Sequence, residues 1–152
     1  MVEEKWPRWN LFFTDASKLV SNGNTGAAFY HPNANHYKLH KLPPETSVFT
    51  GECIALISCL KFIMQHSINY SAIFSDCSSA IQAISKNPIK NCLENPLVCI
   101  IKNLLFTCHQ NNIKVEIVWI PSHTGILGNE TVDQMAKEAT HSGDCEYYAN
   151  LR

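Results

Sequence analysis

The stretch "IPSHTGILGNETVDQMAKEA", residues 120–139, decides the fold. It runs from the end of a strand-like segment, closed by Pro121, through a glycine-bracketed loop into a helix. His123 lies in the loop and Asp133 lies in the first turns of the helix. Functional side chains often lie on loops that a rigid scaffold positions. The stretch therefore suggests that His123 and Asp133 act on the same ligand.

Length and composition fit one globular domain. The chain has 152 residues, of which 45% are hydrophobic and 16% charged, which is enough to bury a core and leaves little room for disorder. No apolar run approaches the roughly 20 residues of a membrane helix, and the polar, acidic N-terminus is not a signal peptide. The net charge is −1 and the 12 Lys and Arg are scattered, so binding to a polyanion would need another source of positive charge.

The cysteines indicate a reducing compartment. There are seven, an odd number, and no Cys-x-x-Cys pair occurs among them. This argues against a disulfide framework and against a zinc site. We therefore expect reduced thiols and an intracellular location, in the nucleus or the cytoplasm.

Hydrophobic periodicity predicts three strands followed by alternating helices and strands, in the order βββαβα(α)βα. This order predicts an α/β fold, with a mixed sheet covered by helices on both faces. We expect an N-terminal extension at 1–9, one domain at 10–141 and a flexible tail at 142–152. The expected strands are 9–14, 27–31, 36–42, 70–76 and 114–120, and the expected helices are 48–66, 78–86, 96–109 and 129–141.

Four carboxylates occupy positions that the pattern marks as buried or nearly so. Glu52 falls on the apolar stripe of its helix, and Asp133 lies at the edge of another stripe. Asp15 and Asp76 follow the buried alternation of their strands and are expected at the strand ends. Buried acids are rare unless they are paired or bind a metal. If the two strands are parallel neighbours, Asp15 and Asp76 emerge side by side at the sheet edge where ligands of α/β proteins bind.

A cluster of carboxylates would repel itself unless a divalent cation lay among its members. Oxygen ligands without thiolate or imidazole favour Mg²⁺ or Mn²⁺. Two such ions can activate a water and stabilise the leaving oxygen of an in-line displacement, which suits phosphoryl transfer.

Each residue taken singly has a simpler explanation. Asp15 or Asp76 alone would most often form a turn or a helix cap, and His123 alone would be an exposed loop residue. Asn129 is expected to be the N-cap of the last helix, and Glu130 to favour its dipole. The order and spacing of the set carry the functional interpretation, not any one residue.

Four blocks of the sequence resemble the motifs of type 1 ribonuclease H, in the family's order and spacing, over residues 10–141. The last block is the most specific. The blocks are "FFTDAS" (12–17), "FTGECIAL" (49–56), "IFSDCSSAIQAI" (73–84) and "WIPSHTGILGNETVDQMAKEA" (119–139).

The resemblance implies a five-stranded mixed sheet and an endonuclease that cleaves the RNA strand of RNA–DNA hybrids. It implies that Asp15, Glu52, Asp76 and Asp133 bind two Mg²⁺ ions, for which Mn²⁺ can substitute. It further implies a water nucleophile, and products with 5′-phosphate and 3′-hydroxyl ends. His123 matches a mobile-loop histidine that helps proton transfer and product release.

Within the family, "SVFTGE" (47–52) and "WIPSHTGILGNE" (119–130) look most like the domains of non-LTR retrotransposons. There the domain follows a reverse transcriptase in a longer polyprotein, which is a possible partner of this chain. One alternative stays open: a catalytically weak or inactive module with a structural or nucleic-acid-binding role, against which the four intact acids count. A flavodoxin-like small-molecule binder is a second alternative, but the chain lacks a phosphate-binding glycine loop.

Three departures from the family pattern concern substrate binding. Ala16 follows the first aspartate where glycine is usual, which Ala tolerates if φ stays negative. Val48 and Phe49 stand where many members have an amide pair that contacts the hybrid. The stretch 87–112 lacks the basic extension of some members, so phosphate contacts are few and affinity should be modest.

Reading the 2′-hydroxyls of a hybrid requires polar groups at a shallow groove. We expect Trp119 to lie in the core rather than to stack on bases. The candidate substrate-binding residues are Ser17, Asn22, Asn24 and Ser78, with backbone amides near Gly51.

Overall fold

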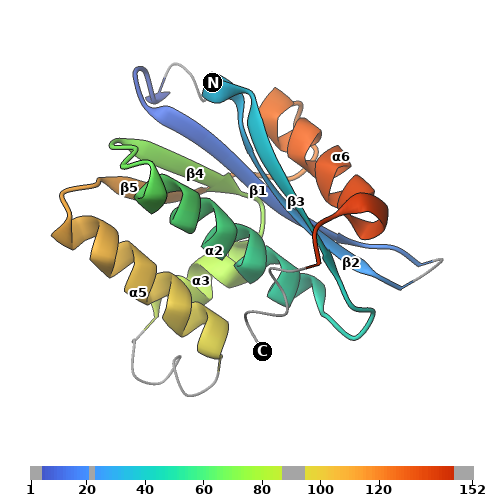
Figure 1. The fold of residues 1–152 in the computed structure, drawn as a ribbon. Helices are drawn as coiled ribbons and strands as arrows, with labels where there is room; N and C mark the ends of the chain where they lie inside the picture. Colours follow the sequence, from blue (N-terminus) through green and yellow to red (C-terminus); the bar gives the residue numbers. More distant parts are fainter. Residues whose placement is uncertain (1–4, 21–22, 87–94, 146–152) are drawn as a thin grey trace.

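The structure, a computed structural model, describes residues 5–20, 23–86 and 95–145. One β-sheet separates helix α6 from helices α2, α3 and α5 (Figure 1). The elements in chain order are β1 (Asn10–Lys18), β2 (Thr25–His31), a 3₁₀ turn (Pro32–Ala34), β3 (His36–Leu42), α2 (Val48–Gln65), β4 (Ser71–Ser75), α3 (Ser78–Ser85), α5 (Pro96–Gln110), β5 (Val115–Trp119) and α6 (Leu127–Ser142).

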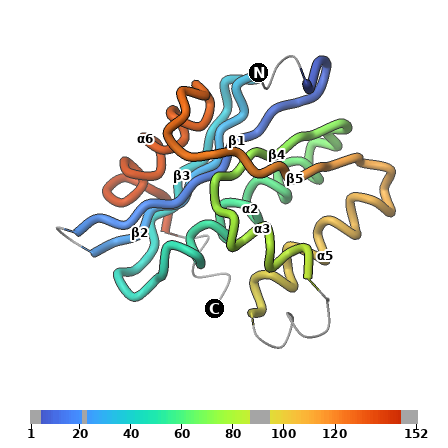
Figure 2. Tube along the Cα trace, turned by 180° about the vertical axis from the view of Figure 1, so that it is seen from behind, coloured from blue at the N-terminus to red at the C-terminus, as the bar shows by residue number. Residues whose placement is uncertain are grey.

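The sheet has five strands in the order β3-β2-β1-β4-β5, and β1 is its central strand (Figure 2). β1 pairs antiparallel with β2 and parallel with β4, so the sheet is mixed, as predicted. The register places Phe13 of β1 opposite Phe74 of β4. The chain segments that carry Asp15 and Asp76 therefore leave this aligned pair in the same direction.

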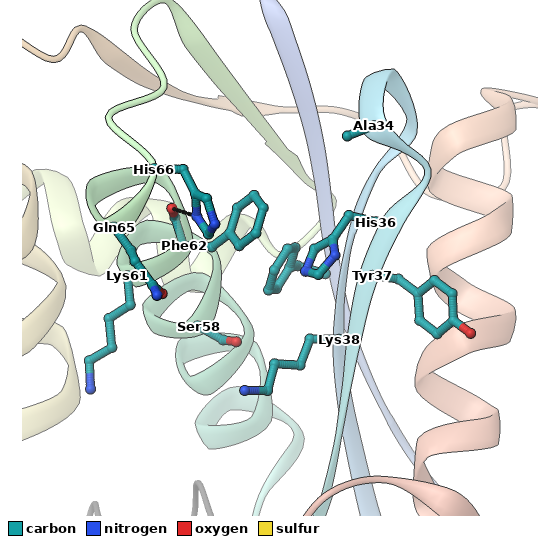
Figure 3. Close-up of a pocket in the computed structure, with 10 residues that line it drawn as sticks. Ala34, His36, Tyr37, Lys38, Ser58, Lys61, Phe62, Gln65 and His66 are labelled. Atoms are coloured by element: carbon teal, nitrogen blue, oxygen red, sulfur yellow. Dashed lines mark hydrogen bonds between the residues drawn. The ribbon is translucent and has the colours of Figure 1, made fainter.

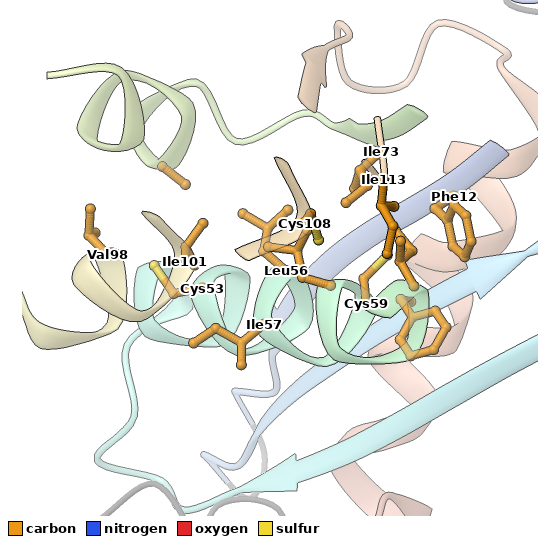
Figure 4. Close-up of a cluster of buried hydrophobic side chains, with 14 residues drawn as sticks. Phe12, Cys53, Leu56, Ile57, Cys59, Ile73, Val98, Ile101, Cys108 and Ile113 are labelled. Atoms are coloured by element: carbon orange, nitrogen blue, oxygen red, sulfur yellow. The ribbon is translucent and has the colours of Figure 1, made fainter. Parts of the chain in front are cut away.

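Hydrophobic side chains fill both faces of the sheet. On one face, α2 and α5 pack onto a cluster that includes Phe12, Leu56 and Ile101 (Figure 4). On the other face, α6 packs through Val132 and Ala136 onto a smaller cluster. By length and composition α2 could cross a membrane, but 61% of the helix is buried inside the fold, as in the core helix of a globular domain.

Two glycines allow the helices to approach β1 closely. A Cβ on Gly128, in the first turn of α6, would lie 2.2–2.5 Å from ring carbons of Phe13. A Cβ on Gly51 of α2 would lie 2.9 Å from the Cβ of Ala16. Any side chain at either position would push its helix away from the central strand, so both glycines position the residues that follow them.

The structure corrects three details of the prediction. β1 continues to Lys18 because Ser17 and Lys18 still pair with β2, so Asp15 lies inside the strand and not at its end. α6 begins at Leu127 with Ile126 as its N-cap, so Asn129 is not the cap. Trp119 is 52% exposed rather than core, because it ends an edge strand whose other residues are only half-buried.

Residues near the C-terminus are attached to the sheet. The Lys41 amide donates to the carbonyl of Asp144, and the Asp144 amide donates to the carbonyl of Leu39. Residues 146–152 lie outside the described residues, so a flexible tail stays a prediction. The six cysteines in the described ranges are free thiols.

Candidate metal centre

Three elements bring three of the predicted carboxylates together. Asp15 comes from the central strand β1, Glu52 from the first half of α2, and Asp76 from the residue that follows β4. Their ligand oxygens all lie within 4.8 Å of one another. Residues 37 and 24 positions apart in sequence thus form one cluster beside the carboxyl end of β4.

Asp15 and Glu52 are held in a nearly dry environment. The Ala16 amide donates to Asp15 Oδ1 at 2.9 Å and lies 3.3 Å from Glu52 Oε1. Burial, followed by the negative charge of Asp76, raises the pKa of Asp15 to about 7. Burial, followed by the charge of Asp15, raises the pKa of Glu52 well above its usual range. Without a cation, both carboxyls therefore hold their protons to a higher pH than ordinary carboxyls do.

Asp76 is less buried and is positioned by a tight turn. The Ser75 hydroxyl accepts a hydrogen bond from the Cys77 amide at 3.1 Å, which fixes the backbone on both sides of Asp76. The Asn129 side-chain amide of α6 donates to Asp76 Oδ2 at 3.5 Å. Asn129 is a site neighbour that the sequence reasoning missed, although its spacing from Val132 and Ala136 places it on the buried stripe of the helix.

The cluster fits a divalent cation. Its donors are carboxylate oxygens, which are the ligands that Mg²⁺ and Mn²⁺ prefer. Glu52 is 3% exposed, and its Oε2 has no hydrogen-bond partner. Within the described part of the chain, no lysine or arginine forms an ion pair with any of the three carboxylates. A cation among them would satisfy the orphaned oxygen and offset the repulsion.

Asp133 lies beside the cluster rather than within it. Its carboxyl contributes to the raised pKa of Asp15, but it does not belong to the group of ligand oxygens that lie within 4.8 Å of one another. Asp133 Oδ2 instead forms an ion pair with Lys137, one helical turn further along α6, at 3.0 Å. The hydrogen bond and charge of Asp133 raise the pKa of Lys137. Lys137 is thus a second neighbour that the sequence reasoning missed.

His123 is not brought to the carboxylates. It lies exposed in the loop before α6, with a positive φ of 52°. The loop is braced by the Thr124 hydroxyl, which donates to the Pro121 carbonyl at 3.1 Å. His123 does not belong to the group of ligand atoms that lie within 4.8 Å of one another.

The candidate substrate-binding residues have mixed positions. Ser17 is half-buried at the end of β1, and Ser78 is exposed at the start of α3. Asn24 donates to the Thr140 carbonyl at 3.5 Å, which gives it a structural contact. The Gly51 amide is already bonded to the Ser47 carbonyl at 3.0 Å. Asn22 lies outside the described residues.

A large cavity lies away from these carboxylates. It has a volume of about 760 Å³ and lies between β3 and the second half of α2 (Figure 3). Phe62 forms its floor, with the rings of His36 and His66 at 4.4 and 4.3 Å from it. No carboxylate lines the cavity. Because divalent-cation chemistry needs the acidic cluster, we assign the candidate site to that cluster and not to the larger cavity.

A mixed five-stranded sheet with acidic side chains from its central strand, from its core helix and from the residue after the next parallel strand defines an α/β domain with a candidate metal site. The comparison with protein families is more specific. The family model described as RNase H matches residues 8–141, and the chain belongs to the RNase H family. None of the curated proteins compared with the chain matches it. Family membership supports a ribonuclease that acts on RNA–DNA hybrids, with a divalent metal at the acidic group.

Proposed function

We propose that this domain is an endonuclease that hydrolyses the RNA strand of RNA–DNA hybrids by a two-metal-ion mechanism. The observation that carries the proposal is the buried cluster of Asp15, Glu52 and Asp76, with an orphaned Glu52 oxygen, in an RNase H fold. The expected products carry 5′-phosphate and 3′-hydroxyl ends.

Asp15, Glu52, Asp76 and Asp133 would hold two Mg²⁺ ions, or Mn²⁺ in their place. When bound, such ions lower the pKa of a water nucleophile and stabilise charge on the scissile phosphate and the leaving oxygen. Because Asp15 and Glu52 are buried, their carboxyls would hold the ions in a fixed position with little water around them. The two carboxyls must lose their protons for the cation to bind, so metal binding should release protons.

His123 would assist proton transfer to the leaving group and release of the product from its position on the loop. The exposure of His123 and the free space around Gly125 support movement of the loop toward the site. In the described conformation the proton donor is therefore absent from the cluster, and loop closure would complete the site.

The substrate would lie against the exposed edge that bears Ser78 and the half-buried Ser17. Motif likeness to non-LTR retrotransposons supports a reverse transcriptase domain as partner in the same polyprotein. The reduced-thiol composition supports an intracellular location, in the nucleus or the cytoplasm.

The test is cleavage of a labelled RNA–DNA hybrid with Mg²⁺, beside EDTA, single-stranded RNA and double-stranded DNA. Asp15→Asn serves as the inactive variant and Glu138→Gln, an exposed carboxylate on α6, as the matched control. We expect cleavage of the hybrid by wild type and Glu138→Gln only, with 5′-phosphate ends. An intact RNA strand at high concentrations of wild-type protein would leave the non-catalytic module as the better description.

A further inference from the structure

We infer that Asn129 is a positioning residue that orients the Asp76 carboxylate and thereby sets the affinity of the acidic cluster for divalent cations. The inference rests on the proposed function. Asn129 is 3% exposed, and its side-chain nitrogen donates to Asp76 Oδ2 at 3.5 Å. Among the described residues, Asn129 is the hydrogen-bond donor to the Asp76 side chain.

Packing and helix capping do not explain an asparagine at this position. Ile126 is the N-cap of α6, so the capping role that asparagine commonly fills is not available to Asn129. Its Oδ1 is buried without a hydrogen-bond partner, which is unfavourable for stability. The other fully buried positions of the same helix face include Val132 and Ala136. Buried amides that lack full hydrogen bonding call for another reason, and the contact with Asp76 supplies one.

The position of Asn129 is fixed by its neighbours. Gly128 brings the first turn of α6 into direct contact with the Phe13 ring. Phe13 stacks on Phe74, with ring centroids 5.3 Å apart. These two aromatic residues lie two positions before Asp15 and Asp76 on their chain segments. The stacked pair of Phe13 and Phe74 therefore fixes the position of the first turn of α6, and with it Asn129, relative to Asp15 and Asp76.

Asp76 is the member of the cluster that most needs such support. Asp15 accepts a backbone hydrogen bond, and Glu52 is confined by the core. Asp76 follows the end of a strand and is only half-buried. Without the Asn129 amide, its carboxylate could turn toward solvent. Hydrogen-bond partners of metal ligands typically contribute on the order of 10- to 100-fold in metal affinity.

The test is Mn²⁺ binding measured by calorimetry in the absence of substrate. Asn129→Leu keeps the side-chain shape and removes the amide, and Asn129→Ala is a second variant in case leucine does not fit. Asn103→Ala, on the exposed face of α5, is the matched control. We expect Mn²⁺ affinity to fall on the order of 10- to 100-fold in the Asn129 variants, with metal-free melting temperatures within a few degrees of wild type.

A double-variant comparison tests the route of the effect. Adding Asn129→Leu to Asp76→Asn should cause no further loss of Mn²⁺ affinity, because both changes disable the same ligand. Wild-type Mn²⁺ affinity in both Asn129 variants, or independent losses in the double variant, would overturn the inference while leaving the proposed nuclease intact. Failure of wild type to bind Mn²⁺ and to cleave a hybrid would instead overturn the proposed function.

Discussion

Asp15 and Glu52 are almost completely buried, whereas Asp133 is partly exposed on α6 and His123 lies in an exposed loop. The first pair belongs to a strand and a helix that share the main core, and neither residue can move without disturbing it. Asp133 forms an ion pair with Lys137, and His123 does not belong to the carboxylate cluster. The comparison teaches that one half of the site is prebuilt by folding, while the other half is available for exchange of ions and products.

The largest expected effect comes from the buried half. Asp15→Asn or Glu52→Gln should lower the rate of hybrid cleavage by about 10³-fold or more, because each removes a ligand that no other side chain can replace. Initial rates with Mg²⁺ provide the measurement. Retention of near wild-type rates by either variant would show that the buried cluster is not the reaction centre.

Asp133→Asn should distinguish the buried half of the site, with Asp15 and Glu52, from the half that contains Asp133. Because Asp133 lies beyond the three-carboxylate cluster, we expect its loss to remove one bound Mn²⁺ ion and leave the other, with less damage to cleavage than Asp15→Asn. Calorimetric stoichiometry measures this directly. Loss of both ions in Asp133→Asn would mean that the two halves bind cations as one unit.

His123→Ala should lower turnover by about 10²-fold, the lower end of a typical general acid–base contribution. Its Mn²⁺ affinity should equal that of wild type, because His123 lies away from the carboxylates. Ser122→Ala, in the same exposed loop, is the control. A parallel loss of Mn²⁺ affinity in His123→Ala would contradict the separation of roles.

The last expected effect concerns stability without metal and not catalysis. The pKa of Asp15 is raised from 3.8 to about 7, so its contribution to stability is complete below about pH 4 and is lost as the pH rises through about 7. Asn cannot titrate, so the melting temperature of Asp15→Asn in EDTA should gain on that of wild type between pH 4 and 8. The gain corresponds to a few kcal/mol at most. A constant difference across this range would show that Asp15 titrates normally, and excess Mg²⁺ should reduce the gain.

Much of the buried half was predictable because its signals are local. Glu52 stands out because a carboxylate on an apolar helix stripe has few explanations, and the alternation of β1 and β4 places Asp15 and Asp76 on a buried face. Those patterns persist in the fold because the sheet and α2 bury these faces from both sides.

The errors have tertiary causes. Asn129 has the chemistry of a helix cap, yet α6 begins at Leu127 and Asn129 is buried within its first turn. Trp119 has the chemistry of a core residue, yet β5 is an edge strand. Lys137 was within reach of prediction, because a lysine four residues after an aspartate on a helix commonly pairs with it.

The close approaches at Gly51 and Gly128 have a consequence for mutational tolerance. Neither residue has a side chain that could touch a substrate or a cation. At each of them, however, β1 and the helix lie too close together to leave room for a methyl group. In a screen of random variants for activity, we expect both positions to be as intolerant of change as the carboxylates. Such a screen would map the contacts of the scaffold together with the chemistry, and only variants assayed for folding would tell the two apart.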